Sequence, residues 1–261
     1  MAQSSQGNVI DLPKRSFACS HCCLEQLCEP CDAPGPMMER LEPIVRHRLP
    51  LRRGDTLFNA GDAFSALYLI YSGTVKTFTF TRDGNEQITG FHLPGGLVGI
   101  DGIHRGIHWS SAVALDKSSV CEIPFEKLEA LAQQVPGLLH QLLSAISREI
   151  LQDVATMQLL GKKAAEERLA SLLLSLTTRF RERGYSAQEI NLPMSRDDIA
   201  NYLGMAHETV SRLFSRFQRQ GLLAVKGKHL WIRDFDKLRT LAGMTIEAER
   251  GDSKDLSPLS G

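Results

Sequence analysis

Cysteine is the residue whose number and spacing in this chain most directly suggest chemistry. Five of the six cysteines lie within Cys19–Cys31, and the sixth is Cys121, far along the sequence. Cys19, Cys22 and Cys28 have the spacing C-x2-C-x5-C, and Cys121 can supply a distant fourth thiolate. Four thiolates suit zinc or an iron–sulfur cluster, and ligand softness alone does not separate the two. The pattern therefore predicts one four-cysteine metal or cluster site.

Two cysteines are surplus to such a site. Cys23 could replace Cys22 as a ligand, and we expect Cys31 to be a solvated or weakly packed thiol. A disulfide framework is a poor explanation, because the polar start of the chain, Met1 to Arg15, lacks the apolar core of an export signal and the cytosol is reducing. No stretch approaches the ~18 apolar residues of a membrane span. We therefore expect a cytoplasmic protein.

The elements that must position the cysteines follow from the pattern along the chain. With 261 residues and 43% hydrophobic content, the sequence suits two modest domains. We predict an α+β protein with an N-terminal β-roll of the cyclic-nucleotide-binding, jelly-roll type, a dimerisation helix and a C-terminal winged helix-turn-helix. The expected segments are a cysteine-rich extension (1–40), the β-roll (41–135), the helix (136–161), the winged domain (162–243) and a flexible tail (244–261).

Short β-type runs separated by turn signals indicate the β-roll. The predicted strands are Ala66–Tyr71, Thr74–Thr81, Gln87–Leu93 and Ser110–Leu115. After them, Glu126–Gln134 is predicted to be a short helix that ends at Pro136-Gly137, and a long helix should then run to about Gly161.

The long helix carries apolar residues at alternating steps of four and three, which is the contact line of a two-stranded coiled coil. These residues are Leu139, Leu143, Ile146, Ile150, Met157 and Leu160. Asp153 occupies the missing position of the repeat. Because a symmetric dimer would bring two such carboxylates together, Asp153 should oppose association and hold the monomer–dimer balance near its midpoint. Alternatively, the helix packs only on its own domain, with Asp153 at the wet edge.

The C-terminal part has helix-turn-helix spacing. It is locally basic, with 13 Lys and Arg against 7 Asp and Glu between Lys162 and Arg233. Lys162–Arg183 is predicted to be a helix, and Ser195–Asp198 resembles the capping box of a second one. Gly204 permits a tight turn before a helix from about His207 to Gln220, whose apolar face is formed by Val210, Leu213, Phe214 and Phe217. Leu222–Val225 and His229–Ile232 should form a hairpin wing.

The other face of that last helix could read DNA. Arg212 can bond guanine, Glu208 can accept from cytosine, and Ser211 can serve a base or a phosphate. Four basic residues are expected to meet phosphates, namely Arg216, Arg219, Lys226 and Lys228. An exposed polar helix face is usually only solvated, but capping box, glycine turn, apolar register and wing together favour DNA binding.

Taken together, these features resemble the fumarate-and-nitrate-reduction regulator (FNR) group of the CRP/FNR (cyclic-AMP receptor protein) transcription factor superfamily. The matching segments are Gly54–Gly61 (GDTLFNAG), Glu86–Leu93 (EQITGFHL), Cys121–Phe125 (CEIPF), Lys162–Leu169 (KKAAEERL), Asn201–Gly204 (NYLG) and Glu208–Arg212 (ETVSR). The likeness extends from about Cys19 to Gly243.

The resemblance implies a [4Fe-4S] cluster on Cys19, Cys22, Cys28 and Cys121, which oxygen would convert to [2Fe-2S]. Loss of the larger cluster would favour monomers, which bind a palindromic operator poorly. Asp153 matches the position that the family uses to keep the cluster-free protein monomeric. Glu208, Ser211 and Arg212 match the base-reading positions, and the loop Arg82–Glu86 matches a contact with RNA polymerase. His207 stands where a small apolar residue is common, so the outermost base preference of the half-site does not follow from the resemblance.

Three other functions compete with an oxygen-responsive regulator. A cyclic-nucleotide receptor would use the β-roll, but the stretch His108–Ala112 lacks the arginine that meets the phosphate. A zinc-stabilised DNA-binding protein would use the cysteines only for structure. Catalysis is disfavoured, because the sequence has no nucleophile elbow, Walker sequence or dinucleotide turn. His104 and His108, near Asp101, are expected to be surface residues.

Overall fold

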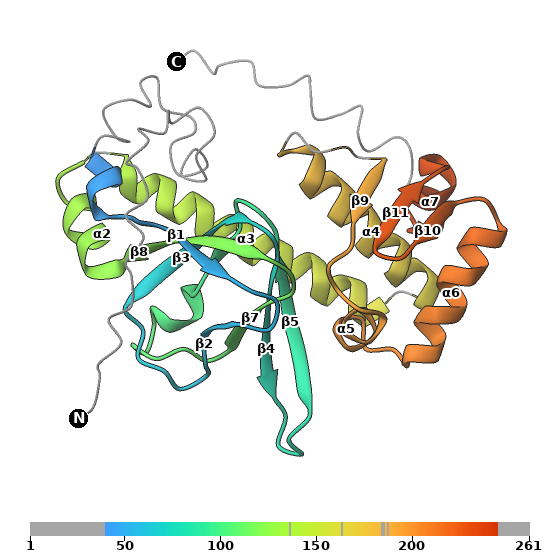
Figure 1. Ribbon diagram of the computed structural model, residues 1–261, viewed down its shortest axis with the longest axis horizontal. Coiled ribbons are helices and arrows are strands. Elements are labelled where there is room, and N and C mark those ends of the chain that lie inside the picture. Colours follow the sequence, from blue (N-terminus) through green and yellow to red (C-terminus); the bar gives the residue numbers. More distant parts are fainter. Residues whose placement is uncertain (1–39, 136, 163, 184–185, 187, 245–261) are drawn as a thin grey trace, which may run out of the picture.

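The computed structural model describes residues 40–135, 137–162, 164–183, 186 and 188–244. A β-roll, one long helix and a smaller C-terminal unit follow one another along the chain. Figure 1 shows the long helix running behind the roll toward the C-terminal unit. This arrangement confirms the predicted α+β class. Among the described residues, no helix has the length and apolar character required to cross a bilayer.

The roll consists of two four-stranded antiparallel sheets, ordered β1-β8-β3-β6 and β2-β7-β4-β5. Side chains from both sheets form a small apolar core between them. The strands are β1 (Arg46–Leu51), β2 (Thr56–Phe58), β3 (Ala66–Ser72), β4 (Val75–Phe80), β5 (Glu86–His92), β6 (Leu97–Val98), β7 (Ser111–Ala114) and β8 (Ser118–Pro124). The four strands predicted from sequence correspond to β3, β4, β5 and β7, whereas β1, β2, β6 and β8 were not anticipated.

The helices lie close to their predicted positions. They are α2 (Phe125–Ala132), α3 (Leu138–Lys162), α4 (Ala165–Arg181), α5 (Arg196–Tyr202), α6 (His207–Arg219) and α7 (Phe235–Leu241). The predicted wing is present as β10 (Leu223–Lys226) and β11 (His229–Ile232), and a third strand, β9 (Glu189–Asn191), extends it on the β11 side. At 25 residues, α3 is about 37 Å long and passes along both the roll and the C-terminal unit.

The helix-turn-helix is fixed by local chemistry at the start of its first helix and at the turn between its two helices. The Ser195 hydroxyl accepts a hydrogen bond from the Asp198 N–H at 3.0 Å, and the Asp198 carboxylate accepts from the Ser195 N–H at 2.8 Å. This is the predicted capping box, and it begins α5. Gly204 then takes a left-handed φ of +59°, which a residue with a side chain adopts only with strain, and this conformation turns the chain into α6.

The C-terminal unit is also hydrogen-bonded to the roll through the side chain of Asn201 on α5. Strand β5 is the edge of its sheet, so one side of its backbone has no strand neighbour. The Asn201 amide fills that position: its oxygen accepts from the Ile88 N–H at 2.7 Å, and its nitrogen donates to the Glu86 carbonyl at 2.7 Å. One amide group thus pairs with β5 as a neighbouring strand would.

An ion pair reinforces this contact. The Lys76 ammonium on β4 lies 3.0 Å from the Asp198 carboxylate and 2.6 Å from that of Glu86. Lys76 and Asp198 are both largely buried. Burial by itself would raise the pKa of Asp198, but hydrogen bonds from Ser195 and the charge of Lys76 hold it below its ordinary value. The pair therefore stays charged at neutral pH, and its contribution is lost only as the pH falls through that lowered pKa.

We predict that Asn201→Ala loosens the C-terminal unit from the roll. The substitution leaves the Ile88 N–H and Glu86 carbonyl of the edge strand unpaired in a partly buried contact, a cost of about 1–3 kcal/mol. Calorimetry should show a lower unfolding midpoint and a separation into two transitions. Asn191→Ala, on the exposed face of β9, is the control. A single transition at the midpoint of the parent protein would contradict the prediction.

Candidate functional site

Helix α6 presents two chemically different faces. Its apolar side chains, Val210, Leu213, Phe214 and Phe217, are buried in the core of the C-terminal unit as predicted. On the opposite side His207, Glu208 and Arg212 are exposed, and Ser211 is partly exposed. Because the buried side chains fix the rotation of the helix, the structure brings all the predicted base-reading residues onto one open face near the N-terminal end of α6.

The basic residues predicted to meet phosphates surround this face. Arg219 lies in the last turn of α6, and Lys226 and Lys228 lie at the turn of the wing, all three exposed. Arg216 is also exposed, but its guanidinium forms an ion pair with Glu166 on α4. A phosphate that binds Arg216 must therefore either displace the Glu166 carboxylate or share the guanidinium with it.

His207 has two side-chain partners that its sequence position did not indicate. Its Nδ1 atom lies 2.6 Å from the Asp197 carboxylate on α5, and its Nε2 atom lies 3.2 Å from the Ser211 hydroxyl. Ser211 follows His207 by four residues, so the two side chains share one helix face. Asp197 is ten residues away in sequence and reaches His207 only because the turn at Gly204 folds α5 back toward α6.

Comparison with known proteins identifies both parts of the fold. Residues 167–241 match the family described as "Crp-like helix-turn-helix domain", and residues 48–135 match "Cyclic nucleotide-binding domain". The chain is 49% identical over 227 residues to the fumarate and nitrate reduction regulatory protein of Salmonella typhimurium, covering 87% of this chain and 91% of that protein. It is 48% identical over 229 residues to the transcriptional activator protein Anr of Pseudomonas aeruginosa, covering 88% and 94%.

The chain belongs to the Crp/FNR family of transcription regulators. Among solved structures, FixK2 from Bradyrhizobium japonicum is 31% identical, with a TM-score of 0.68 over 74% of this chain and 96% of that one. The relatives that this chain matches are transcription regulators and not enzymes, as the sequence indicated. The open face of α6 lies within the segment that matches the Crp-like helix-turn-helix domain.

In this Crp/FNR regulator an internal carboxylate occupies part of the β-roll that a nucleotide receptor would need. The Asp101 carboxylate accepts hydrogen bonds from the N–H groups of Trp109 and Ser110, at 2.9 and 2.8 Å, and from the Ser110 hydroxyl at 2.8 Å. These donors lie in the stretch compared above with the phosphate site of cyclic-nucleotide receptors. A negatively charged side chain already bonded to them disfavours an anionic ligand.

The prediction that His108 is a surface residue is wrong, whereas His104 is exposed as expected. His108 is 3% exposed, its ring stacks on Phe58 with centroids 3.7 Å apart, and its Nδ1 atom lies 3.3 Å from Asp101. Stacking on an aromatic ring and pairing with a carboxylate compensate for the loss of water around the imidazole. This histidine therefore closes the core of the roll.

Cys121 lies at the centre of the sheet rather than on a surface loop. It is on β8, opposite Leu69 of β3, and is 1% exposed. Its apolar cluster includes Leu41 and Val45, which follow the predicted extension, and Leu138 and Leu142 at the start of α3. The other five cysteines lie outside the described residues, namely Cys19, Cys22, Cys23, Cys28 and Cys31. No group of three or more metal-binding side chains occurs among the described residues.

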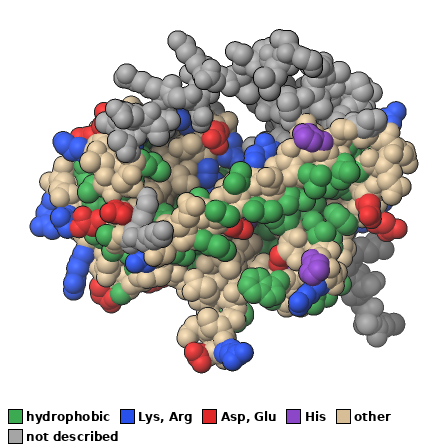
Figure 2. Space-filling view, turned by 180° about the vertical axis from the view of Figure 1, so that it is seen from behind, with side chains coloured by type: hydrophobic (Ala, Val, Ile, Leu, Met, Phe, Trp, Pro, Cys, Tyr) green, Lys and Arg blue, Asp and Glu red, His purple; other side chains and the backbone are tan. Residues whose placement is uncertain are grey.

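The outer face of α3 is an uncovered apolar stripe. Leu139, Leu143, Ile150, Met157 and Leu160 are exposed, as are Leu151 and Val154 beside them. Figure 2 shows hydrophobic side chains gathered in a band across this side of the molecule. Ile146 is the exception among the predicted contact residues, because it is partly buried against the roll. Asp153 is exposed within the stripe.

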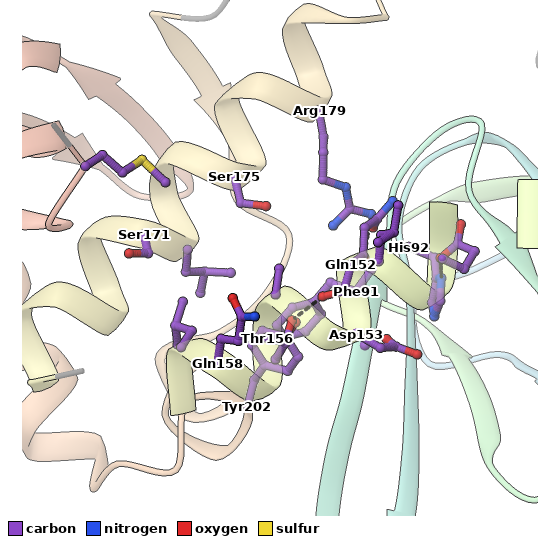
Figure 3. A pocket seen from close by; sticks show the side chains of 17 residues that line it. Phe91, His92, Gln152, Asp153, Thr156, Gln158, Ser171, Ser175, Arg179 and Tyr202 are labelled. Atoms are coloured by element: carbon purple, nitrogen blue, oxygen red, sulfur yellow. Dashed lines mark hydrogen bonds and ion pairs between the residues drawn. The ribbon is translucent and has the colours of Figure 1, made fainter. Parts of the chain in front are cut away.

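A cavity of about 420 Å³ lies where α3, the roll and the C-terminal unit meet. Figure 3 shows Arg179 reaching from α4 toward Phe91 and His92, and its guanidinium donates to the Phe91 carbonyl at 2.8 Å. Beside it, the hydroxyls of Thr156 on α3 and Tyr202 on α5 are 2.8 Å apart. The C-terminal unit therefore contacts both the roll and α3 around this cavity.

Asp153 lines the same cavity. Partial desolvation raises the pKa of its carboxyl, and the nearby Glu149 raises it further, while His92 opposes both. Its surroundings therefore disfavour the charged form already in the single chain. A second Asp153 placed against it would disfavour that form more strongly.

We predict that Arg212→Ala reduces binding to the cognate DNA site by about 1–3 kcal/mol with little effect on random DNA, because a base contact carries sequence preference. Titration of labelled cognate and scrambled duplexes at one salt concentration measures both. Arg219→Ala is the matched control and should weaken the two duplexes alike, as loss of a phosphate contact does. The same equal weakening in Arg212→Ala would identify Arg212 as a phosphate contact.

Proposed function

We propose that this Crp/FNR regulator is a cytoplasmic, oxygen-responsive transcription regulator. In the absence of oxygen it would hold a [4Fe-4S] cluster on Cys19, Cys22, Cys28 and Cys121, form a homodimer through α3, and bind palindromic promoter sites to activate or repress genes. The observation that carries the proposal is that Cys121 shares one apolar cluster with the inner face of α3.

The residues present fit a cluster of this kind. Cys121 offers a soft thiol ligand, and three further thiolates are required, since a [4Fe-4S] cluster is held by four. Leu41 packs in the same group of buried apolar side chains as Cys121. Cys28 precedes Leu41 by thirteen residues, and a chain of that length can span about 40 Å when extended. The cysteines of the extension are therefore within reach of Cys121.

Packing links this site to α3. The [4Fe-4S] cluster would supply an oxygen-sensitive cross-link between the extension and β8. Leu138, Leu142 and Ala145 of α3 pack in the same core as Cys121, so tightening that core fixes the helix from its first turn. The opposite face of α3 is the exposed apolar stripe that a second copy would cover. Its repeat, Leu139, Leu143, Ile146, Ile150, Met157 and Leu160 with Asp153 between, defines the proposed dimer contact.

Dimerisation controls binding because a palindromic site has two half-sites. Two linked helix-turn-helix units engage both at once, and the second contact becomes effectively intramolecular. A monomer has one DNA-binding face and gains no such advantage. Glu208, Ser211 and Arg212 would read bases in each half-site, with His207 at its outer edge and Arg216 on a phosphate.

The tip of the β4–β5 hairpin would contact RNA polymerase. Arg82, Asp83 and Asn85 are exposed there, and Figure 1 shows the hairpin extending away from the roll. Just behind this tip, Asn201 of α5 binds Glu86 and Ile88 at the start of β5. A polymerase contact at the tip would thus sit on the same rigid unit as the DNA-binding helices.

We predict that the full chain, reconstituted under argon with iron and sulfide, becomes brown and bleaches in air. Cys121→Ala should remove the visible absorption, because one of four ligands is lost, whereas Cys31→Ala should retain it. The measurement is the visible spectrum together with iron and sulfide content. A colourless protein that takes up zinc and ignores iron would support a structural zinc site instead.

We predict that Asp153→Ala raises the dimer fraction and DNA binding in air, since it removes the carboxylate from the contact line of α3. Sedimentation velocity and titration of a palindromic duplex report the two effects. Asp83→Ala, an equal charge change at the hairpin tip, is the control. If the aerobic Asp153→Ala protein sediments as a monomer like the parent, Asp153 does not oppose association.

A further inference from the structure

Asp197, His207 and Ser211 form a continuous chain of hydrogen-bonding groups at the N-terminal end of α6. The Asp197 carboxylate lies 2.6 Å from His207 Nδ1, and His207 Nε2 lies 3.2 Å from the Ser211 hydroxyl. Asp197 is on α5, while His207 and Ser211 are on α6. The chain therefore couples the first helix of the motif to the face of the second helix that meets DNA.

With a neutral imidazole, the direction of each hydrogen bond follows from the groups themselves. An ionised carboxylate only accepts, so the proton of the neutral imidazole must sit on Nδ1, facing Asp197. Nε2 then carries a lone pair and accepts from Ser211. The serine hydroxyl has a single proton, and once that proton points at His207, only oxygen lone pairs remain for a group approaching from outside.

We propose that Asp197, acting through His207, makes Ser211 a hydrogen-bond acceptor toward DNA and so determines which base it selects. This inference rests on the proposed function, in which Ser211 faces the major groove. In that groove, adenine N6 and cytosine N4 offer donors, whereas thymine O4 and guanine O6 and N7 only accept. Ser211 selects a base that presents an amino group. Asp197 and His207 are positioning residues for this contact.

The surrounding structure keeps this arrangement in place. The buried face of α6 fixes the helix rotation, and the left-handed Gly204 fixes the angle between α5 and α6. The capping box at Ser195 and Asp198 fixes the start of α5, where Asp197 is the second helical residue. A hydroxyl alone would rotate to suit either a donor or an acceptor. The fixed imidazole removes that freedom.

Asp197→Asn tests the proposal, because it keeps the shape of the side chain and removes the obligatory acceptor. The Asn amide can donate to Nδ1, which places the imidazole proton on Nε2 and turns the ring into a donor toward Ser211. The serine hydroxyl is then free to donate outward. At the base pair facing Ser211, the preference for adenine or cytosine should fall by about fivefold relative to thymine or guanine, the effect of about one hydrogen bond.

The measurement is competitive binding of the full chain, purified under argon, to a pool of palindromic duplexes randomised through one half-site. Sequencing of bound and free DNA gives the relative affinity for all four bases at each position. Removing one negative charge also strengthens binding to every duplex, but this effect cancels in the ratios taken at each position. The base ratio at a single position is therefore the readout.

Three control variants isolate the hydrogen-bond chain. Asp197→Glu keeps the acceptor and should retain the parental preference. Asp236→Asn, an exposed carboxylate on α7, should change no base ratio. Ser211→Ala should abolish the preference at its base pair, and adding Asp197→Asn to it should then have no further effect there.

Failure of the inference is distinguishable from failure of the proposed function. If the parent protein selects no bases at any position, sequence-specific DNA binding is wrong and the inference falls with it. If the parent selects a half-site but Asp197→Asn alters no base ratio, Ser211 is not held as an acceptor, and the inference alone is wrong. If Ser211→Ala leaves the base ratios at every position unchanged, Ser211 contacts a phosphate and not a base, and the inference is likewise wrong.

Discussion

One side-chain amide on α5 pairs with the edge strand of a sheet and joins the C-terminal unit to the roll. Strand β5 ends the second sheet of the roll, and Asn201 supplies the donor and acceptor that a further strand would have supplied. Because Asn201 is on α5, the same contact fixes the helix-turn-helix against the roll, and the roll is packed on α3. The proposed DNA-binding face of α6 thereby has one orientation relative to the proposed dimer axis, which recognition of two half-sites requires.

Helix α3 divides its two faces between two tasks. Its inner face shares a core with Cys121, and its outer face is an apolar stripe interrupted by Asp153. A change in the core can thus alter the position of the stripe without any direct contact between ligand and partner. In the proposed dimer, the carboxylate in the stripe would keep association weak enough for a modest packing change to decide it, since a ligand shifts an equilibrium only by its differential free energy.

Local patterns were predictable from sequence, whereas long-range pairings were not. The capping box, the glycine turn, the wing and the apolar register of α3 each depend on residues within one or two turns, and all of them appear in the structure. Strand β8 was missed, because its place between β1 and β3 is decided by partners at least 47 residues away. His108 was misplaced for the same reason: Phe58, on which it stacks, comes from another strand. Apart from the residue type, nothing in the sequence indicated that Asn201 would form hydrogen bonds with β5.

The polar face of α6 shows why exposed side chains near a binding surface cannot be interpreted one at a time. In sequence, Arg216 and Ser211 are independent contacts, but in the structure each already has a partner within the chain. Glu166 neutralises Arg216, so binding a phosphate there exchanges one anion for another and gains less than a free arginine would. In the hydrogen-bond chain proposed above, the Ser211 proton points at His207, so binding there would be restricted in chemistry rather than in strength. Internal partners of this kind reduce non-specific affinity and raise the share of binding that depends on the bases, which is the balance a regulator searching a genome needs.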